Sequence, residues 1–186
     1  MRKLKSILLY TALGLLANIG HAETADLEAL RVGDMRKLVF HSEAIAGTDV
    51  AFLSEDGTEM TLADFNGKYI TLNFWATWCA PCRKEMPNLS ALQSTLGGDD
   101  FTVITIATGP NPPAKITAFF NDIGIDNLPA HRDPRQALAR EMRVLGLPAT
   151  ILLDRHGQEI ARLLGDANWH SDSALAIIQS LIASEI

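Results

Sequence analysis

The chain has 186 residues, of which 47% are hydrophobic and 20% are charged, enough to build the core of one domain. Its formal net charge is −6 at pH 7, and it contains no run of basic residues. This balance argues against a nucleic-acid-binding function. The only two cysteines are Cys79 and Cys82.

The N-terminal segment has the pattern of an export signal. Met1–Lys5 carries three cations, residues 6–20 are mostly apolar, and Ala22 is a small residue suited to signal-peptidase cleavage. The apolar run, about 14 residues long, is shorter than the roughly 20 residues that span a bilayer. We therefore predict a secretory signal peptide over residues 1–22 and a periplasmic protein, with an uncleaved inner-membrane anchor as the alternative. Cleavage would leave 13 Lys and Arg against 22 Asp and Glu, a net charge of −9.

Residues 23–49 lie between this signal and the domain predicted over residues 50–186. Residues 23–41 are charged with scattered leucines, a pattern compatible with one or two short helices interrupted at Gly33. Residues 42–49 are predicted to be a loop. The sequence leaves two interpretations of the whole segment open: a spacer, or an extension that packs on the domain.

The domain begins with two short predicted strands at residues 50–53 and 59–62. The Asp56-Gly57 pair between them is a turn signal typical of a β-hairpin. Residues 69–75 are aromatic, β-branched and nearly uncharged, as expected for a strand that is buried on both faces. Leucines then recur at helical spacing over residues 83–96, which predicts a helix directly after this strand.

The two cysteines lie where the strand gives way to the helix, with Pro81 in a first-turn position that its missing N–H does not disturb. The first turn of a helix has unpaired N–H groups and a partial positive charge of roughly half a unit. A Cys79 thiolate there is stabilised, so the thiol pKa should fall below its free value of about 8.5. Cys82, about one turn further on, should face inward and lie close enough to form a disulfide with Cys79. Such a pair can exchange two electrons with another protein through a mixed disulfide.

Two structural roles for the cysteine pair compete with this redox interpretation. A disulfide that closes a four-residue loop would restrict the unfolded chain by only roughly 2 kcal/mol, against about 3 kcal/mol for a fifteen-residue loop. Half of a zinc site would need two more ligands. The histidines show no ligand spacing, and two of them, His131 and His170, are expected on the surface. The redox interpretation is therefore preferred.

The remainder of the chain alternates strands and helices. The predicted elements are a buried strand at 101–107, a helix from 111 to about 123, a helix that Asp133 caps and that runs from Pro134 through Met142, strands at 150–153 and 159–164 joined by a turn, and a last helix that Ser171 or Asp172 caps. This alternation predicts an α/β fold in which helices cover both faces of a sheet.

Two stretches, residues 74–87 (FWATWCAPCRKEMP) and residues 146–154 (GLPATILLD), resemble the TlpA/ResA branch of exported thioredoxin-like proteins. The similarity covers roughly residues 50–182. It implies a thioredoxin-like fold with a central mixed β-sheet, helices on both faces and an extra N-terminal β-hairpin. Members of this branch mostly act as membrane-fed thiol reductants. They keep the cysteines of apocytochromes c, or of copper-delivery proteins and the copper centre of cytochrome oxidase, reduced during assembly.

The resemblance also implies roles for individual residues. Cys79 would be the nucleophile, Cys82 the resolving thiol, and Pro148 a cis-proline that faces the disulfide. The backbone of Leu147 would then pair with a substrate strand, and Trp78 would belong to the docking surface. The expected substrate-binding residues are Trp78, Ala80, Pro81 and Leu147. No cofactor and no metal are expected.

One position departs from the pattern of thioredoxins, which usually carry a buried Asp six residues before the first cysteine. That position is Asn73 in this chain, and an amide cannot act as a base. Glu85 lies three residues after Cys82 on the same predicted helix and could face that thiol, directly or through water. We therefore expect Glu85 to take over the proton-handling role.

The sequence thus predicts a monomeric, periplasmic thiol-disulfide oxidoreductase. The resemblance implies that it reduces cysteine pairs of exported proteins during cytochrome c or cytochrome oxidase copper-centre assembly, and that a membrane thiol donor supplies its electrons. Two alternatives stay open: an oxidant that inserts disulfides, which the reduction potential separates from a reductant, and a Cu(I)-binding chaperone that uses both thiolates. The chaperone lacks a Met-rich segment or a placed histidine to complete a soft copper site.

Overall fold

The computed structural model describes residues 27–184. Its strands are β1 (Val39–Ile45), β2 (Phe52–Leu53), β3 (Glu59–Met60), β4 (Tyr69–Trp75), β5 (Phe101–Thr108), β6 (His131–Asp133), β7 (Ala149–Leu153) and β8 (Glu159–Leu164). Its α-helices are α2 (Ala80–Leu96), α3 (Pro113–Asp122), α4 (Ala137–Glu141) and α5 (Asp172–Ala183), and two 3₁₀-helices are η1 (Gly33–Lys37) and η2 (Leu62–Phe65). The signal peptide predicted over residues 1–22 lies outside the described residues.

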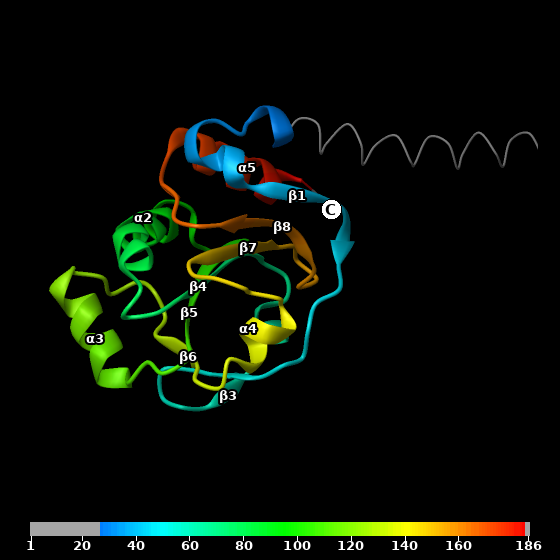
Figure 1. Cartoon of the computed structure of the whole chain (residues 1–186). Helices are drawn as coiled ribbons and strands as arrows, with labels where there is room; N and C mark the ends of the chain where they lie inside the picture. The colour runs from blue at the N-terminus through cyan, green and yellow to red at the C-terminus, as the bar shows by residue number, and fades with distance from the viewer. Residues whose placement is uncertain (1–26, 185–186) are drawn as a thin grey trace, which may run out of the picture.

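All eight strands belong to one mixed sheet with the order β1-β8-β7-β4-β5-β6-β2-β3. Strands β4, β5 and β6 run parallel to one another, and every other neighbouring pair is antiparallel. Helices α2 and α3 lie on one side of the central strands and α4 lies on the other (Figure 1). The predicted α/β fold with helices on both faces of a central mixed sheet is therefore confirmed.

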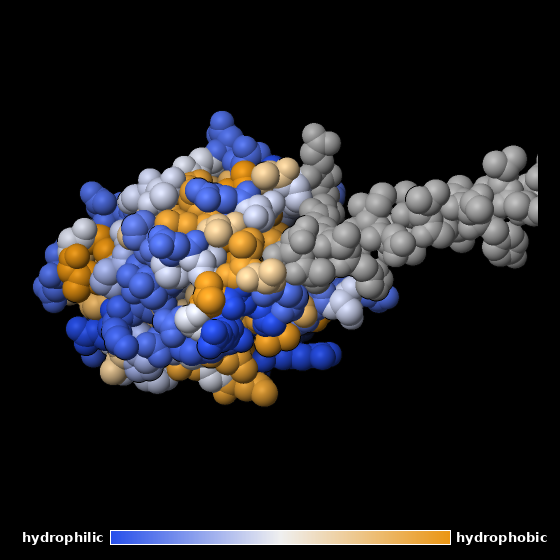
Figure 2. All heavy atoms as spheres, turned by 90° about the horizontal axis from the view of Figure 1, so that it is seen from above, coloured by the Kyte–Doolittle hydropathy of each residue, from blue (hydrophilic) through white to orange (hydrophobic). Residues whose placement is uncertain are grey.

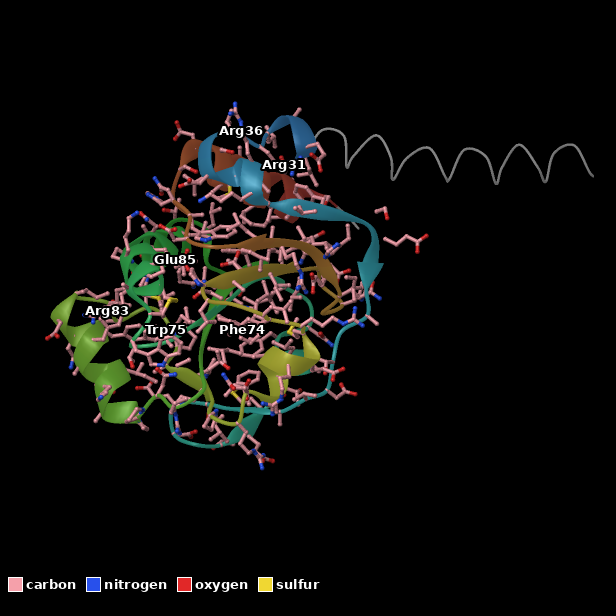
Figure 3. All side chains as sticks on the ribbon, in the orientation of Figure 1. Arg31, Arg36, Phe74, Trp75, Arg83 and Glu85 are labelled. Atoms are coloured by element: carbon pink, nitrogen blue, oxygen red, sulfur yellow. A yellow bond between two sulfur atoms is a disulfide. The ribbon has the colours of Figure 1, made fainter. Side chains whose placement is uncertain are left out.

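Strand β4 divides the hydrophobic core into two layers, and all seven of its residues are buried. Trp75 points into the layer formed with α2 and α3, where its ring stacks on that of Phe120 with a centroid separation of 5.4 Å. The neighbouring Phe74 points into the opposite layer, which contains Leu138 of α4, and Figure 3 labels both side chains. A strand covered on both faces loses the usual alternation of polar and apolar residues, which explains the continuous apolar run in the sequence.

Residues 27–45 pack on the domain rather than forming a spacer. Met35 in η1 and Leu38 are fully buried, and β1 pairs antiparallel with β8, with Val39 opposite Arg162. Of the two interpretations that the sequence left open, the packed extension is the one observed for these residues. The loop predicted over residues 42–49 is wrong in its first half, because β1 continues to Ile45.

The pair of short strands before β4 lies at the opposite edge of the sheet. Strands β2 and β3 pair antiparallel, with Phe52 opposite Met60, and β2 also pairs with β6. Gly57 in the connecting turn has a φ of 91°, a conformation that favours glycine. Each strand contains only two residues, fewer than the sequence predicted.

Helix α4 begins at Ala137, three residues later than the sequence predicted. Asp133, expected to cap a helix that starts beside it, is the last residue of β6. Its carboxylate nevertheless accepts hydrogen bonds from the backbone N–H groups of Ala137, at 2.8 Å, and Ala139, at 2.9 Å. The capping role of Asp133 is therefore retained across an intervening turn.

His131 is buried, so the prediction that it lies on the surface is wrong. Its ring lies between the rings of Phe52 and Phe65, at centroid distances of 5.3 and 6.2 Å. This burial lowers the pKa of His131, because the apolar surroundings disfavour the charged imidazolium. His170 is exposed, as expected.

Hydrophilic side chains dominate the face seen in Figure 2, and apolar side chains form separate patches between them. Across residues 27–184, no helix has both the length and the apolar character that crossing a membrane requires.

Candidate active site

The two cysteines form a disulfide at the N-terminus of α2. The Sγ atoms of Cys79 and Cys82 are 1.97 Å apart and their Cα atoms 5.3 Å apart. Cys79 is the N-cap residue, and its sulfur accepts a hydrogen bond from the backbone N–H of Cys82 at 3.4 Å. The sulfur of Cys79 thus lies where the free N–H groups and the positive end of the helix stabilise negative charge.

The two sulfurs differ in their access to solvent. Cys79 is 6% exposed and Cys82 is fully buried, so only Cys79 offers an edge to an incoming sulfur. After reduction, the helix terminus would stabilise a Cys79 thiolate. The Cys82 thiol would remain buried beside it, within bonding distance. This arrangement is suited to thiol–disulfide exchange, in which one thiolate attacks and the other resolves the mixed disulfide.

The Leu147–Pro148 peptide bond is cis, which agrees with the expectation for Pro148. Leu147 is half-buried and lines a groove of about 280 Å³ together with Trp78. The structure thus brings Leu147 to the same groove as the residue that precedes Cys79, although the two lie far apart in the sequence.

The segment around the disulfide forms the exposed rim of the site. Trp78 is 64% exposed, which is unusual for a large aromatic side chain, and Ala80 and Pro81 are exposed as well. A second groove of about 380 Å³ lies against Trp78 and includes Phe119 of α3. Trp78, Ala80 and Pro81, the three residues predicted to contact substrate at this end, are thus exposed beside Cys79.

The loop before Cys79 is held by Asn111, a residue whose place in the sequence predicts only the start of a helix. The buried Asn111 side-chain oxygen accepts hydrogen bonds from the backbone N–H of Thr77, at 2.8 Å, and from its hydroxyl, at 3.0 Å. Its amide group donates to the carbonyl of Thr108 at 2.8 Å. No local pattern could have revealed this contact, because Thr77 and Asn111 are connected only through the pairing of β4 with β5.

Glu85 is a buried carboxylic acid on the inner face of α2 (Figure 3). Its carboxylate accepts hydrogen bonds from the side-chain amide of Asn73, at 2.8 Å, and from the backbone N–H of Ala167, at 3.0 Å. Burial raises the pKa of Glu85 to about 7, against the opposing effect of these two hydrogen bonds, and Asp166 adds a smaller upward contribution. The pKa of Glu85 therefore lies near neutral pH, above that of an exposed glutamate.

Asn73 connects Glu85 to the sheet. The Asn73 amide donates a second hydrogen bond to the hydroxyl of Thr150, at 2.9 Å, and Thr150 lies opposite it in the pairing of β4 with β7. The side-chain oxygen of Asn73 is buried and has no hydrogen-bond partner among residues 27–184. Trp169 also lies close enough to lower the pKa of Glu85, although its indole N–H makes no hydrogen bond of normal geometry within the described part of the chain.

Across residues 27–184, no three side chains of His, Cys, Asp or Glu are grouped as metal ligands would be. The sulfurs of Cys79 and Cys82, which would be the softest ligands, are bonded to each other in this state.

Comparison with known proteins gives a consistent picture. The family described as Redoxin matches residues 43–178. The thiol-disulfide oxidoreductase ResA of Geobacillus kaustophilus is 31% identical over 117 residues, which cover 62% of this chain and 66% of that protein. The thioredoxin-like protein YneN of Bacillus subtilis is 31% identical over 122 residues, which cover 66% of this chain and 71% of that protein.

A solved structure, that of a secreted thiol-disulfide isomerase from Corynebacterium glutamicum, superposes with a TM-score of 0.65 at 28% identity and covers 80% of this chain and 95% of that one. The chain spans slightly less than two thirds of the length of the ResA proteins that it matches. The matched region contains the whole of the site described above, from Asn73 to Trp169. The chain belongs to the Redoxin family and, within it, to the TlpA/ResA-like proteins of thioredoxin fold.

Proposed function

We propose that the protein is a thiol-disulfide oxidoreductase that acts on cysteines of other proteins. The observation that carries this proposal is the position of the Cys79 sulfur at the N-cap of α2, with Cys82 buried behind it. The names of the relatives, ResA thiol-disulfide oxidoreductases among them, support the same activity.

In the proposed reaction, the Cys79 thiolate attacks one sulfur of a substrate disulfide. A Cys79–substrate disulfide forms, the substrate S–S bond breaks, and the other substrate sulfur leaves as a thiolate that takes up a proton. Cys82 then loses its proton and attacks Cys79, which restores the Cys79–Cys82 disulfide and releases the second substrate thiol. The substrate gains two electrons and two protons, and the protein becomes oxidised.

Glu85 is proposed to receive the proton that Cys82 loses in the second step. Cys82 is fully buried, so its proton needs an acceptor inside the protein. Glu85 follows it by three residues on α2, which places the two side chains on the same side of the helix. Burial raises the pKa of Glu85 to about 7, close to the value that suits a general base at neutral pH.

Reduction is the proposed direction, with exported proteins as the substrates. The N-terminal pattern of residues 1–22 supports a location outside the cytoplasm, as does the similarity to a protein described as secreted. Within that setting, the resemblance to TlpA/ResA proteins favours cysteine pairs of apocytochromes c or of copper-delivery and oxidase proteins as targets. The chain has no cysteines besides Cys79 and Cys82, so an external thiol donor must restore the reduced state.

The proposed activity can be tested with a peptide that carries one internal disulfide. The reduced wild-type protein should convert the peptide to its dithiol form. The Cys82→Ser variant should instead accumulate a mixed disulfide that intact-mass spectrometry detects at the sum of the two masses. The Cys79→Ser variant, which retains the buried thiol alone, is the matched control and should form little adduct. Equal adduct formation by the two variants would contradict the assignment of Cys79 as the nucleophile.

A further inference from the structure

The exposed Trp78 separates two grooves beside the disulfide. The first, about 280 Å³ in volume, contains Leu145, Leu147 and Arg140, and the Arg140 guanidinium donates a hydrogen bond to the carbonyl of Arg135 at 2.7 Å. The second, about 380 Å³, contains Arg83 from α2 and Lys115 from α3 and is called the basic groove below. Trp78, the residue before Cys79, lines both grooves, so both lie within reach of side chains that neighbour a cysteine bound at Cys79.

Both cations of the basic groove are available to a ligand. Across residues 27–184, neither Arg83 nor Lys115 takes part in an ion pair. The Arg83 guanidinium lies over the ring of Phe119, 4.7 Å from its centroid, and Figure 3 shows Arg83 between α2 and α3. This contact holds the guanidinium in the groove without satisfying its N–H groups. Lys84, the next residue, differs because it is paired with Asp166 at 3.2 Å.

One acidic residue, Asp122, also lines the basic groove. It is the last residue of α3, seven positions after Lys115, which corresponds to about 10 Å along the helix axis. It forms no ion pair with either cation in the described part of the chain. The groove therefore keeps a net positive charge, whereas the chain as a whole carries a net charge of −6.

We infer that the basic groove recognises an acidic side chain of the substrate, placed within a few residues of the cysteine that reacts with Cys79. This inference rests on the proposed function and specifies its substrate class: extended segments with a cysteine flanked by Glu or Asp. Charge complementarity at an exposed groove acts mainly on the rate of association and weakens with salt. One contact between unit charges at about 4 Å in water corresponds to a preference of about fivefold.

The experiment uses short peptides whose single cysteine is joined in a disulfide to 2-thiopyridine. When the Cys79 thiolate attacks the peptide sulfur, the disulfide to the pyridyl sulfur breaks, and the pyridine-2-thione that leaves is followed by its absorbance. Peptides with Glu, Gln or Lys two residues before or after the cysteine are compared in stopped-flow measurements with the reduced wild-type protein. At low salt, for one of the two positions, the reaction rate should be highest with Glu, lower with Gln and lowest with Lys. The rate with Glu should exceed the rate with Gln about fivefold. The preference for Glu should become smaller in 0.5 M salt, because the screening length then falls to a few ångströms, about the separation of the two charges.

Substitutions in the protein test whether the preference for Glu over Gln arises in the basic groove. Arg83→Gln combined with Lys115→Gln should reduce the Glu-to-Gln rate ratio to about one, and Lys115→Gln alone should reduce it partly. Lys84→Gln removes the same charge from α2 outside the groove and should retain the ratio. Because the ratio compares two peptides on one protein, a change in the reactivity of Cys79 itself cancels. A ratio that persists in the double variant would overturn the assignment to this groove.

Reaction with 2,2′-dithiodipyridine, a small uncharged disulfide, separates failure of this inference from failure of the proposed function. If the wild-type protein reacts with this probe but shows equal rates with Glu and Gln peptides, the inference is wrong and the proposed function stands. If the reduced protein does not react with the probe at all, both are wrong.

Discussion

Replacement of Glu85 by Gln should change how the stability of the oxidised protein depends on pH. Burial raises the pKa of Glu85 from an ordinary 4.5 to about 7 in the folded protein. The folded protein therefore binds this proton more tightly than the unfolded chain does, and its stability falls as pH rises from about 4.5 to about 7. Above that window the loss is complete. Gln cannot ionise, so the variant lacks this loss.

The size of the effect follows from the two pKa values. Their difference corresponds to about 3 kcal/mol, because each pKa unit is equivalent to about 1.4 kcal/mol. About 2 to 3 kcal/mol of this change falls between pH 5 and pH 8. The free energy of unfolding of Glu85→Gln minus that of the wild type should therefore rise by this amount over that range. A constant offset is also expected, since Gln replaces one acceptor oxygen with a donor beside the Asn73 amide and the Ala167 N–H.

Urea unfolding at pH 5, 6, 7 and 8, followed by tryptophan fluorescence without reductant, measures this difference by linear extrapolation. Only the pH dependence matters, so the constant offset and every titration common to both proteins cancel. Glu55→Gln in the exposed turn between β2 and β3 controls for the removal of one negative charge. If this difference in unfolding free energy stays level or falls as pH rises, ionisation of the buried Glu85 does not destabilise the folded protein, and the argument is refuted.

Two further predictions concern residues whose importance only the structure reveals. Asn111→Ala should lower the free energy of unfolding by about 1 to 3 kcal/mol, because the N–H and hydroxyl of Thr77 lose their acceptor. Urea unfolding measures this free energy. An unchanged value would mean that the loop before Cys79 is held in another way. The pKa of His131 is lowered by burial, so the unfolded chain binds more protons than the folded protein below about pH 6.5, and stability should fall as the solution is acidified through that value. His131→Leu should remove this part of the acid sensitivity. Thermal unfolding of the variant and the wild type between pH 7 and pH 5 measures it. An equal fall of the melting temperature with pH in the two proteins would contradict the prediction.

The site and the elements around it were predictable because their signals are local. The apolar run of β4, the position of Pro81 in the first turn of α2 and the leucine repeat of that helix each lie within one element. The cis bond before Pro148 was predicted from a family resemblance rather than from physics, since only about 5–6% of X–Pro bonds are cis. The resemblance extended to both motifs of the site, and the comparisons agree with it.

Strand β1 was not predictable, because its partner β8 is more than a hundred residues further along the chain. Its residues are mostly exposed and lack the alternation that marks a strand. His131 lies in a three-residue strand between Phe52 and Phe65, which come from two other segments. Its burial depends on how those segments meet. The environment of Glu85 likewise includes the N–H of Ala167, 82 residues away.

The reduction potential of the Cys79–Cys82 pair is the most direct measurement of the central claim that the protein is a reductant acting through this pair. The protein is equilibrated with mixtures of reduced and oxidised dithiothreitol or glutathione, quenched with a thiol-alkylating reagent, and its two forms are counted by mass spectrometry. The account predicts a potential of about −250 mV or lower. A value near about −120 mV would make the protein an oxidant, and a pair that does not interconvert reversibly in any of these mixtures would contradict a redox role altogether.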